Sequence, residues 1–306
     1  MRIALASSSP VGIPILEALA EGDHEIVFVI TNPDKETGRG QKISANAFAQ
    51  AAADRSIPVE KPKSHEEITG IFSSYPVDLV VTVAYGRLIK KEALSIPPRG
   101  WINIHFSQLP RWRGAAPVQY SLLSGDKSTG ISIFQLDEGM DTGPLFFCKN
   151  FDIGADDTTS TLLLRLSTEA AKSINAVLDE ILQGAQPTPQ SSEGATLAPK
   201  FTKEDGRLDF RREAQTLINK IRALGENPGT YLTFRNERLN VARARVVNEL
   251  SFSGDCGTFY AMKNALYVKA SDAWIELLEV KPAGKKAMSG SEFARGARIG
   301  EGERCE

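Results

Sequence analysis

The spacing of hydrophobic and polar positions divides the chain into two regions with different expected structures. In the first region, short apolar runs alternate with segments whose apolar residues recur every three or four positions, which predicts strands alternating with amphipathic helices. From Thr230 onward, short alternating runs follow one another without helices between them, which predicts a small β-barrel. The expected elements of the first region include strands over 2–7, 25–30, 79–84 and 101–105 and helices over 11–21, 45–55 and 158–182.

The alternation of strands and helices near the start predicts a parallel sheet with helices on its faces, the α/β fold class. Leu79–Ala84 is almost entirely apolar, as expected of a central strand that is buried on both sides. A stretch rich in Pro, Gln, Ser and Gly begins at Gly184 and reads as an extended linker. We therefore expect an α/β domain over 1–183, a linker over 184–205 and a β-rich domain over 206–306.

Length and cysteine content exclude several classes of protein. The 306 residues are enough for two domains with separate cores. Three Cys without a CxxC pair argue against a disulfide framework or a thiolate zinc site, and no other metal-ligand spacing is present. The N-terminus is too polar for a signal peptide, and no apolar run approaches the roughly 18 to 20 residues of a membrane span. We expect a cytoplasmic protein.

Charge is distributed unevenly. Residues 207–306 hold 17 Lys and Arg against 13 Asp and Glu, whereas residues 1–206 hold 19 against 25. A basic C-terminal third on an otherwise acidic protein can mark a nucleic-acid contact, although charge alone favours chance surface composition. Both interpretations stay open.

The candidate chemistry lies around the strand that ends at His105. Asn103 and His105 are two positions apart, so both side chains point to one face of that strand. Asp141 follows a second β-like run, in a Gly-rich turn. Ligands of open α/β sheets bind beyond the carboxyl ends of the strands, where His105 and the pair Tyr85-Gly86 both lie. An amide, an imidazole and a carboxylate suit acyl transfer, with two groups to polarise a carbonyl and one to handle protons.

Two loops add candidate binding groups. The polar loop 31–44 is long, and it carries Arg39 between two glycines with Lys35 and Lys42 nearby. Such a loop can grip phosphates, although its residues alone favour a solvated surface loop. The Pro- and Gly-containing loop 107–114 exposes backbone groups that suit a flat heterocyclic ligand. No GxGxxG motif is present, which disfavours a dinucleotide site.

Longer motifs resemble those of a known family. NIHFSQLPRWRGAAP, which starts at Asn103, and TGISIFQLDEGMDTGPL, which starts at Thr129, resemble the folate-dependent formyltransferases. The resemblance runs from Ile3 to about Met288. The RGAAP run, the GRG loop and AGKKAM near the C-terminus resemble in particular the members that formylate methionine on initiator tRNA.

The resemblance implies a fold and a reaction. The family fold is an N-terminal Rossmann-like parallel-sheet domain followed by a C-terminal barrel of the OB type. The implied activity transfers a formyl group from 10-formyltetrahydrofolate to the amino group of methionine on initiator tRNA, without a metal. The expected partners are therefore the folate and the charged tRNA, and we expect a monomer.

The resemblance also implies roles for individual residues. The family's catalytic residues fall on Asn103, His105 and Asp141; the first two would donate to the oxyanion, and Asp141 would orient His105, raise its pKa and relay the proton. The folate-contacting loop falls on Ser107, Gln108, Leu109 and Pro110, near Tyr85 and Gly86; family members usually carry Leu where this chain has Gln108. Arg39, Lys35 and Lys42 would grip the acceptor end of the tRNA, and the barrel would hold its outer face through Arg243, Arg245, Lys281, Lys285 and Lys286.

Two alternatives compete with this interpretation. A formyltransferase that acts on an amino-sugar nucleotide would share the Asn, His and Asp, but the GRG loop and the basic C-terminal region favour tRNA. An RNA-binding protein without catalytic activity would not need the intact set of three residues.

Overall fold

The computed structural model describes residues 1–37, 42–248, 250 and 252–306. These residues pack as two compact units that interleave along the sequence. Unit 1 comprises Met1–Pro117, Ser128–Asp152 and Ser160–Pro199, and unit 2 comprises Val118–Lys127, Ile153–Thr159 and Lys200–Glu306. The domain limits expected from the sequence stay a prediction.

Unit 1 is built on a seven-stranded sheet with strand order β5-β2-β1-β6-β7-β8-β9. The pairs from β5 to β7 are parallel, so the expected α/β fold is confirmed. β8 and β9 form an antiparallel hairpin against β7, which makes the sheet mixed. The strands are β1 (Arg2–Ala6), β2 (Glu25–Ile30), β5 (Val59–Glu60), β6 (Leu79–Val83), β7 (Trp101–His105), β8 (Ser128–Gln135) and β9 (Leu145–Asp152).

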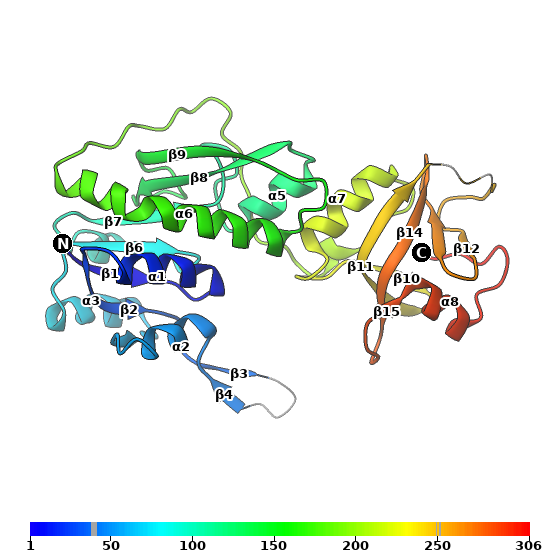
Figure 1. The fold of residues 1–306 in the computed structure, drawn as a ribbon, viewed down its shortest axis with the longest axis horizontal. Helices are drawn as coiled ribbons and strands as arrows, with labels where there is room; N and C mark the ends of the chain where they lie inside the picture. Colours follow the sequence, from blue (N-terminus) through cyan, green and yellow to red (C-terminus); the bar gives the residue numbers. More distant parts are fainter. Residues whose placement is uncertain (38–41, 249, 251) are drawn as a thin grey trace. The chain divides into compact units, whose positions relative to one another are not determined.

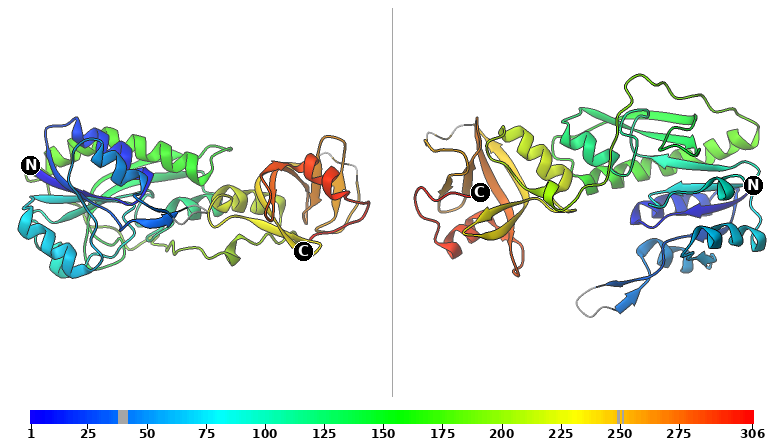
Figure 2. Two further views of the ribbon diagram at one scale, coloured as in Figure 1. Left: turned by 90° about the horizontal axis from the view of Figure 1, so that it is seen from below. Right: turned by 180° about the vertical axis from the view of Figure 1, so that it is seen from behind.

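Helices cover both faces of this sheet. α1 and α6 lie on one face and α3 lies on the other (Figures 1 and 2). In α6 the buried residues recur at helical spacing, including Leu162, Leu166, Ala170 and Ile174, so one stripe of the helix faces the core. The helices and short 3-10 turn of unit 1 are η1 (Pro10–Gly12), α1 (Ile13–Ala20), α2 (Ala47–Ala53), α3 (His65–Ser74), α4 (Lys91–Leu94) and α6 (Thr159–Leu182). α5 (Pro117–Leu123) belongs almost entirely to unit 2.

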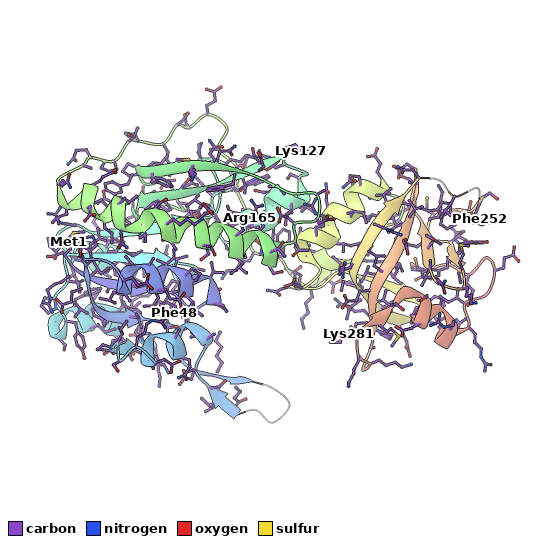
Figure 3. The ribbon with its side chains drawn as sticks, in the orientation of Figure 1. Met1, Phe48, Lys127, Arg165, Phe252 and Lys281 are labelled. Carbon is purple, nitrogen blue, oxygen red and sulfur yellow. The ribbon has the colours of Figure 1, made fainter. Side chains whose placement is uncertain are left out.

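An aromatic cluster fills the core beneath α3. Phe28 of β2 and Trp101 of β7 each contact Phe72 of α3 edge-on, with ring centroids 5.9 and 5.7 Å apart. This geometry is the preferred one for aromatic pairs. Phe48 of α2, labelled in Figure 3, is fully buried as well. The core therefore holds β7, the strand that carries Asn103 and His105, in a rigid setting.

The long polar loop after β2 contains a short hairpin that the sequence did not predict. β3 (Lys35–Thr37) pairs with β4 (Lys42–Ser44) in antiparallel register. Arg39 lies outside the described residues.

Unit 2 contains a six-stranded antiparallel sheet with the order β10-β11-β14-β13-β12, and β15 pairs with β14. A register shift between Val241 and Ala244 bends β11 against β14. This curled sheet agrees with the barrel expected from the alternating runs. The elements are η2 (Glu204–Gly206), α7 (Ala214–Leu224), β10 (Tyr231–Phe234), β11 (Glu237–Val247), β12 (Phe259–Ala261), β13 (Leu266–Lys269), β14 (Trp274–Pro282), β15 (Met288–Ser289) and α8 (Gly290–Ala297).

Candidate active site

The end of β7 carries a buried imidazole that is paired with a partly buried carboxylate. His105 Nδ1 lies 3.5 Å from Asp141 Oδ2, and the two side chains are only 5% and 17% exposed. On the other side of the ring, Nε2 lies 2.9 Å from the carbonyl oxygen of Trp112. Both ring nitrogens of His105 therefore face oxygen atoms, and both partners come from loops outside β7.

Burial decides the charge of this imidazole. Loss of hydration lowers the pKa of His105, and this effect outweighs the Asp141 carboxylate and the Trp112 carbonyl, which both raise it. The prediction that the Asp141 carboxylate raises the pKa of His105 is confirmed, but burial, which the sequence did not reveal, outweighs this effect. Both facing oxygens can only accept, and the Trp112 carbonyl is the nearer of the two, at 2.9 Å against 3.5 Å for Asp141 Oδ2, so we place the single proton of the neutral ring on Nε2. Nδ1 is then left as a base that faces the carboxylate of Asp141.

Asn103 is oriented by the neighbouring strand. Thr82 of β6 lies opposite Asn103 in the parallel register, and its buried hydroxyl donates a 2.7 Å hydrogen bond to Asn103 Oδ1. The same hydroxyl lies 3.1 Å from the carbonyl of Ile102, a longer contact. With Oδ1 held by Thr82, the amide nitrogen of Asn103 points away from β6. Asn103 shares a strand face with His105, so the structure agrees with the expected placement of the amide.

The Asp141 turn has an unusual backbone. Asp141 has a φ of 54°, the left-handed region that residues with a Cβ rarely adopt. At position 143 a Cβ would lie 1.7 Å from the carbonyl oxygen of Gln135, so only Gly fits there. The carboxylate of Asp141 accepts a 2.7 Å hydrogen bond from the backbone N–H of Gly114. The turn therefore holds Asp141 between His105 and the loop that follows β7.

The expected folate loop is held by a serine that sequence reasoning missed. Ser132 of β8 lies opposite His105, accepts a 3.1 Å bond from Leu109 N–H and donates a 2.8 Å bond to the carbonyl of Ser107. The side chain of Gln108, which lies between Ser107 and Leu109 in the chain, is exposed, and the Leu109–Pro110 peptide is cis. A polar residue inside the apolar run of β8 was the available signal for Ser132.

Tyr85 and Gly86 lie at the end of β6 as expected. The ring of Tyr85 belongs to the core cluster beneath α3, with 4% of the residue exposed. Burial raises the pKa of its phenol. Because the ring is buried, only backbone groups of Tyr85 remain for contact with a ligand, and its carbonyl already accepts a 3.3 Å bond from Asn32. Gly86 has a φ of 76°, which turns the chain out of the strand.

Comparison with known proteins places this site in a family. The family model described as "Formyl transferase" matches residues 1–178, and that described as "Formyl transferase, C-terminal domain" matches residues 200–298. Methionyl-tRNA formyltransferase of Streptomyces coelicolor is 40% identical over 309 residues, covering 99% of each chain. That of Thermobifida fusca is 39% identical over 307 residues with the same coverage. The chain belongs to the methionyl-tRNA formyltransferase family.

Solved structures of lower identity share the fold. A methionyl-tRNA formyltransferase from Clostridium thermocellum aligns with a TM-score of 0.55 and 20% identity, over 80% of this chain and 93% of that one. HypX from Aquifex aeolicus, in complex with tetrahydrofolic acid, aligns with a TM-score of 0.66 and 16% identity, over 96% of this chain and 47% of that one. The resemblance to the folate-dependent formyltransferases stated from the motifs is confirmed.

The candidate tRNA contacts of this family member occur in both units. In unit 1, Lys35 is exposed on β3 and Lys42 begins β4. In unit 2, Lys285 and Lys286 are exposed in the turn between β14 and β15, and Lys281, labelled in Figure 3, precedes them on β14. The two candidate cations of β11 face acidic neighbours: Arg245 pairs with Glu276 at 2.7 Å, and Arg243 lies opposite Glu279 in the sheet register. The exposed lysines of the Lys285–Lys286 turn are therefore better candidates for contact with phosphates than the arginines of β11, whose charge is offset by Glu276 and Glu279.

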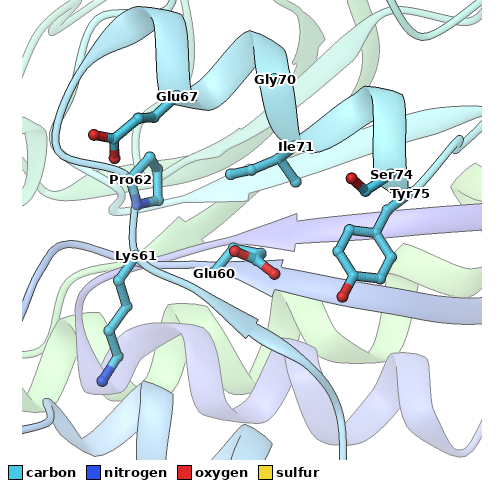
Figure 4. Close-up of a pocket in the computed structure, with 8 residues that line it drawn as sticks. All are labelled: Glu60, Lys61, Pro62, Glu67, Gly70, Ile71, Ser74 and Tyr75. Carbon is cyan, nitrogen blue, oxygen red and sulfur yellow. The ribbon is translucent and has the colours of Figure 1, made fainter.

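A pocket at the other edge of the sheet contains none of the candidate residues. It lies between β5 and α3 and is lined by groups of mixed charge, including Glu60, Lys61, Glu67 and Tyr75 (Figure 4). Lys61 is paired with Asp34 at 2.6 Å. Within the described part of the chain, no group of three or more His, Cys, Asp and Glu residues is arranged to hold a metal ion. No helix there has the length and apolar character that a membrane crossing needs.

Proposed function

We propose that this chain transfers the formyl group of 10-formyltetrahydrofolate to the amino group of methionine on initiator tRNA. The observation that carries the proposal is the buried His105–Asp141 pair, which lies beside the amide of Asn103 in a chain of this family. An amine acceptor is itself the nucleophile, so the protein needs no nucleophilic side chain. It needs groups that hold the reactants, stabilise a developing negative oxygen and accept a proton.

Asn103 is the donor best placed for the developing oxyanion. Thr82 holds the amide oxygen, so the amide nitrogen remains to donate toward the formyl oxygen. His105 was expected to be a second donor. Its Nε2 proton already faces the carbonyl of Trp112, so donation to the oxyanion requires an exchange of partners when substrate binds. Asn103 needs no such exchange, which makes it the principal donor.

The His105–Asp141 pair takes the proton that the amine loses. As the new C–N bond forms, the proton passes to Nδ1 of the neutral imidazole, and the Asp141 carboxylate stabilises the imidazolium. Bound 10-formyltetrahydrofolate supplies the formyl group. When the bond between the formyl carbon and N10 breaks, tetrahydrofolate is the leaving group. The pair returns the proton to that nitrogen, so the reaction gains and loses no proton overall.

Binding would come from the two loops and the basic surfaces. The 107–110 loop adjoins His105 and is held rigid by Ser132, which fits a flat ligand bound through backbone groups. Gly86 would border the same site. Lys35, Lys42, Lys285 and Lys286 would contact tRNA phosphates, and Arg39 is assigned to the acceptor end from the sequence alone. Because charged initiator tRNA is used in translation, we place the protein in the cytoplasm, and a monomer stays the expected state.

A formylation assay with two acceptors tests the function. Purified chain receives labelled 10-formyltetrahydrofolate, charged initiator tRNA and an amino-sugar nucleotide. We expect label on methionyl-tRNA and none on the sugar; the reverse would establish the amino-sugar alternative. His105→Ala should reduce the label on tRNA by at least about 10²-fold because the proton acceptor is lost. Unchanged formylation by this variant would contradict the assigned chemistry.

A further inference from the structure

The segment that the sequence predicts to be a linker contacts two loops of the candidate active site, the loop after β7 and the loop that carries Asp141. Residues 188–198, here called the strap, contact the start of β9, next to the turn that carries Asp141, through Thr188, which exchanges backbone hydrogen bonds of 2.7 and 2.8 Å with Leu145. The strap contacts the loop after β7 through Thr196, whose hydroxyl accepts a 2.9 Å bond from Trp112 N–H. The strap therefore joins the segment beside His105 to the segment that carries Asp141.

Gln190 is the side chain of the strap that contacts both loops at once. Its Nε2 donates to the carbonyl of Asp141 at 2.9 Å and to the carbonyl of Gly143 at 2.7 Å. Its Oε1 accepts from Nε and Nη2 of Arg113 at 3.1 and 2.7 Å. Both hydrogens of the amide nitrogen and both lone pairs of the oxygen thus have partners, which leaves a single orientation of the amide.

These bonds close a ring around Asp141. Gly114, which follows Arg113, donates its N–H to the Asp141 carboxylate at 2.7 Å. Gln190 holds the Asp141 carbonyl on one side and Arg113 on the other, so the carboxylate and the backbone of Asp141 are anchored to the same loop. A left-handed backbone such as that of Asp141 persists only where its surroundings hold it. The two hydrogen bonds from Gln190 Nε2 to the carbonyls of Asp141 and Gly143 help to hold this backbone conformation.

We propose that Gln190 is a positioning residue, which sets the location of the Asp141 carboxylate against His105 Nδ1. This inference rests on the proposed function for its effect on the rate. Gln190 lies 49 positions from Asp141, and it reaches the turn through the carbonyls of Asp141 and Gly143 while its amide oxygen holds Arg113. We expect its removal to change the distance across the His105–Asp141 pair, which is 3.5 Å in the intact protein.

The test replaces the amide by a group that bonds Arg113 only. Gln190→Glu keeps an acceptor for the guanidinium but turns carboxylate oxygen toward two carbonyls, so the Asp141 turn must shift. A displacement of about 1 Å in a catalytic group costs roughly 10²-fold in rate. We expect kcat to fall by about 10- to 100-fold with the KM values for folate and tRNA within about twofold of the wild type.

Gln186→Glu is the matched control. Gln186 is exposed, and its side chain bonds the carbonyl of Gly184 at 3.1 Å and no other residue of the described ranges, so the same substitution there should leave kcat unchanged. If Gln190→Glu does not fold, Gln190→Ala tests the same point without an added charge. A wild-type kcat in the folded variant would overturn the positioning role.

A second readout separates positioning from general destabilisation. The ring resonances of His105, followed against pH by NMR, report the field of Asp141. In Gln190→Ala, which adds no charge of its own, the titration of His105 should move, whereas in Gln186→Ala it should match the wild type. An unchanged titration would overturn the proposal. If the wild-type protein formylates no tRNA, the proposed function fails, and the NMR comparison still tests the role of Gln190.

Discussion

The His105 site of unit 1 and the Lys285–Lys286 turn of unit 2 represent two different ways of placing functional groups. At the first, His105, Asp141 and Asn103 each have a partner from a segment far away in the sequence. At the second, two lysines are exposed on a hairpin turn. Chemistry at one carbon atom requires fixed positions, whereas attraction to phosphates requires only exposed charge of the right sign. Substitutions should accordingly change kcat at the first region and affinity at the second.

The largest effect is expected at Asp141. Asp141→Asn keeps the shape of the side chain but removes the charge that stabilises the His105 imidazolium. We expect kcat to fall by about 10²- to 10⁴-fold, the contribution usual for acid–base catalysis, with little change in KM. Steady-state formylation kinetics measure this effect.

Asp137→Asn serves as the control for the same turn. Asp137 is exposed and accepts bonds from Gly139 and Thr142, so it supports the turn without facing His105. Its substitution should cost much less in kcat. Equal losses at the two positions would mean that the turn, and not the charge of Asp141, matters.

A smaller loss is expected at Thr82. Thr82→Val keeps the volume of the side chain and removes the hydroxyl that orients Asn103. One hydrogen bond contributes about 0.5–1.5 kcal/mol, which corresponds to a decrease in kcat of up to about tenfold. Thr82→Ser restores the hydroxyl and should restore most of the rate. A rate in Thr82→Ser as low as in Thr82→Val would point to packing and away from the hydroxyl.

A change in affinity alone is expected at the hairpin turn. The double substitution Lys285→Ala with Lys286→Ala should raise the KM for tRNA several-fold at unchanged kcat. The slope of log KM against log salt should become shallower by about 0.7–0.9 for each phosphate contact that is lost. Lys172→Ala, on α6, is the control, because that lysine is already paired with Glu169. A salt slope equal to that of the wild type would exclude the turn from the tRNA contact.

The smallest expected effect is on the pH dependence of stability. Burial lowers the pKa of His105, so near and below pH 6.5 the unfolded chain binds a proton that the folded chain does not. Stability is therefore lost as the pH falls through this range. In His105→Gln, the free energy of unfolding should change less between pH 7 and pH 5, by at most about 1.36 kcal/mol per pH unit. An unaltered slope in urea titrations would contradict the lowered pKa.

Local patterns in the sequence predicted much of the fold and the central residues of the site. The period of the apolar residues predicted β1, β2, β6 and β7 because buried strands and amphipathic helices differ in that period. The two-residue spacing of Asn103 and His105 predicted their common face for the same local reason. The hairpin of β3 and β4 was missed, since its polar residues carry no such period.

The amino-acid sequence by itself determined the fold class, the family and the identity of the residues at the end of β7, because each depends on neighbours within a few positions. Tertiary structure alone decided which distant groups hold those residues: Thr82 for Asn103, Ser132 for the 107–110 loop and Gln190 for Asp141. It also decided the direction of the pKa of His105, which follows from burial by many parts of the chain. Hydrogen bonds and desolvation depend on which segments meet in space, and no spacing along the chain encodes that.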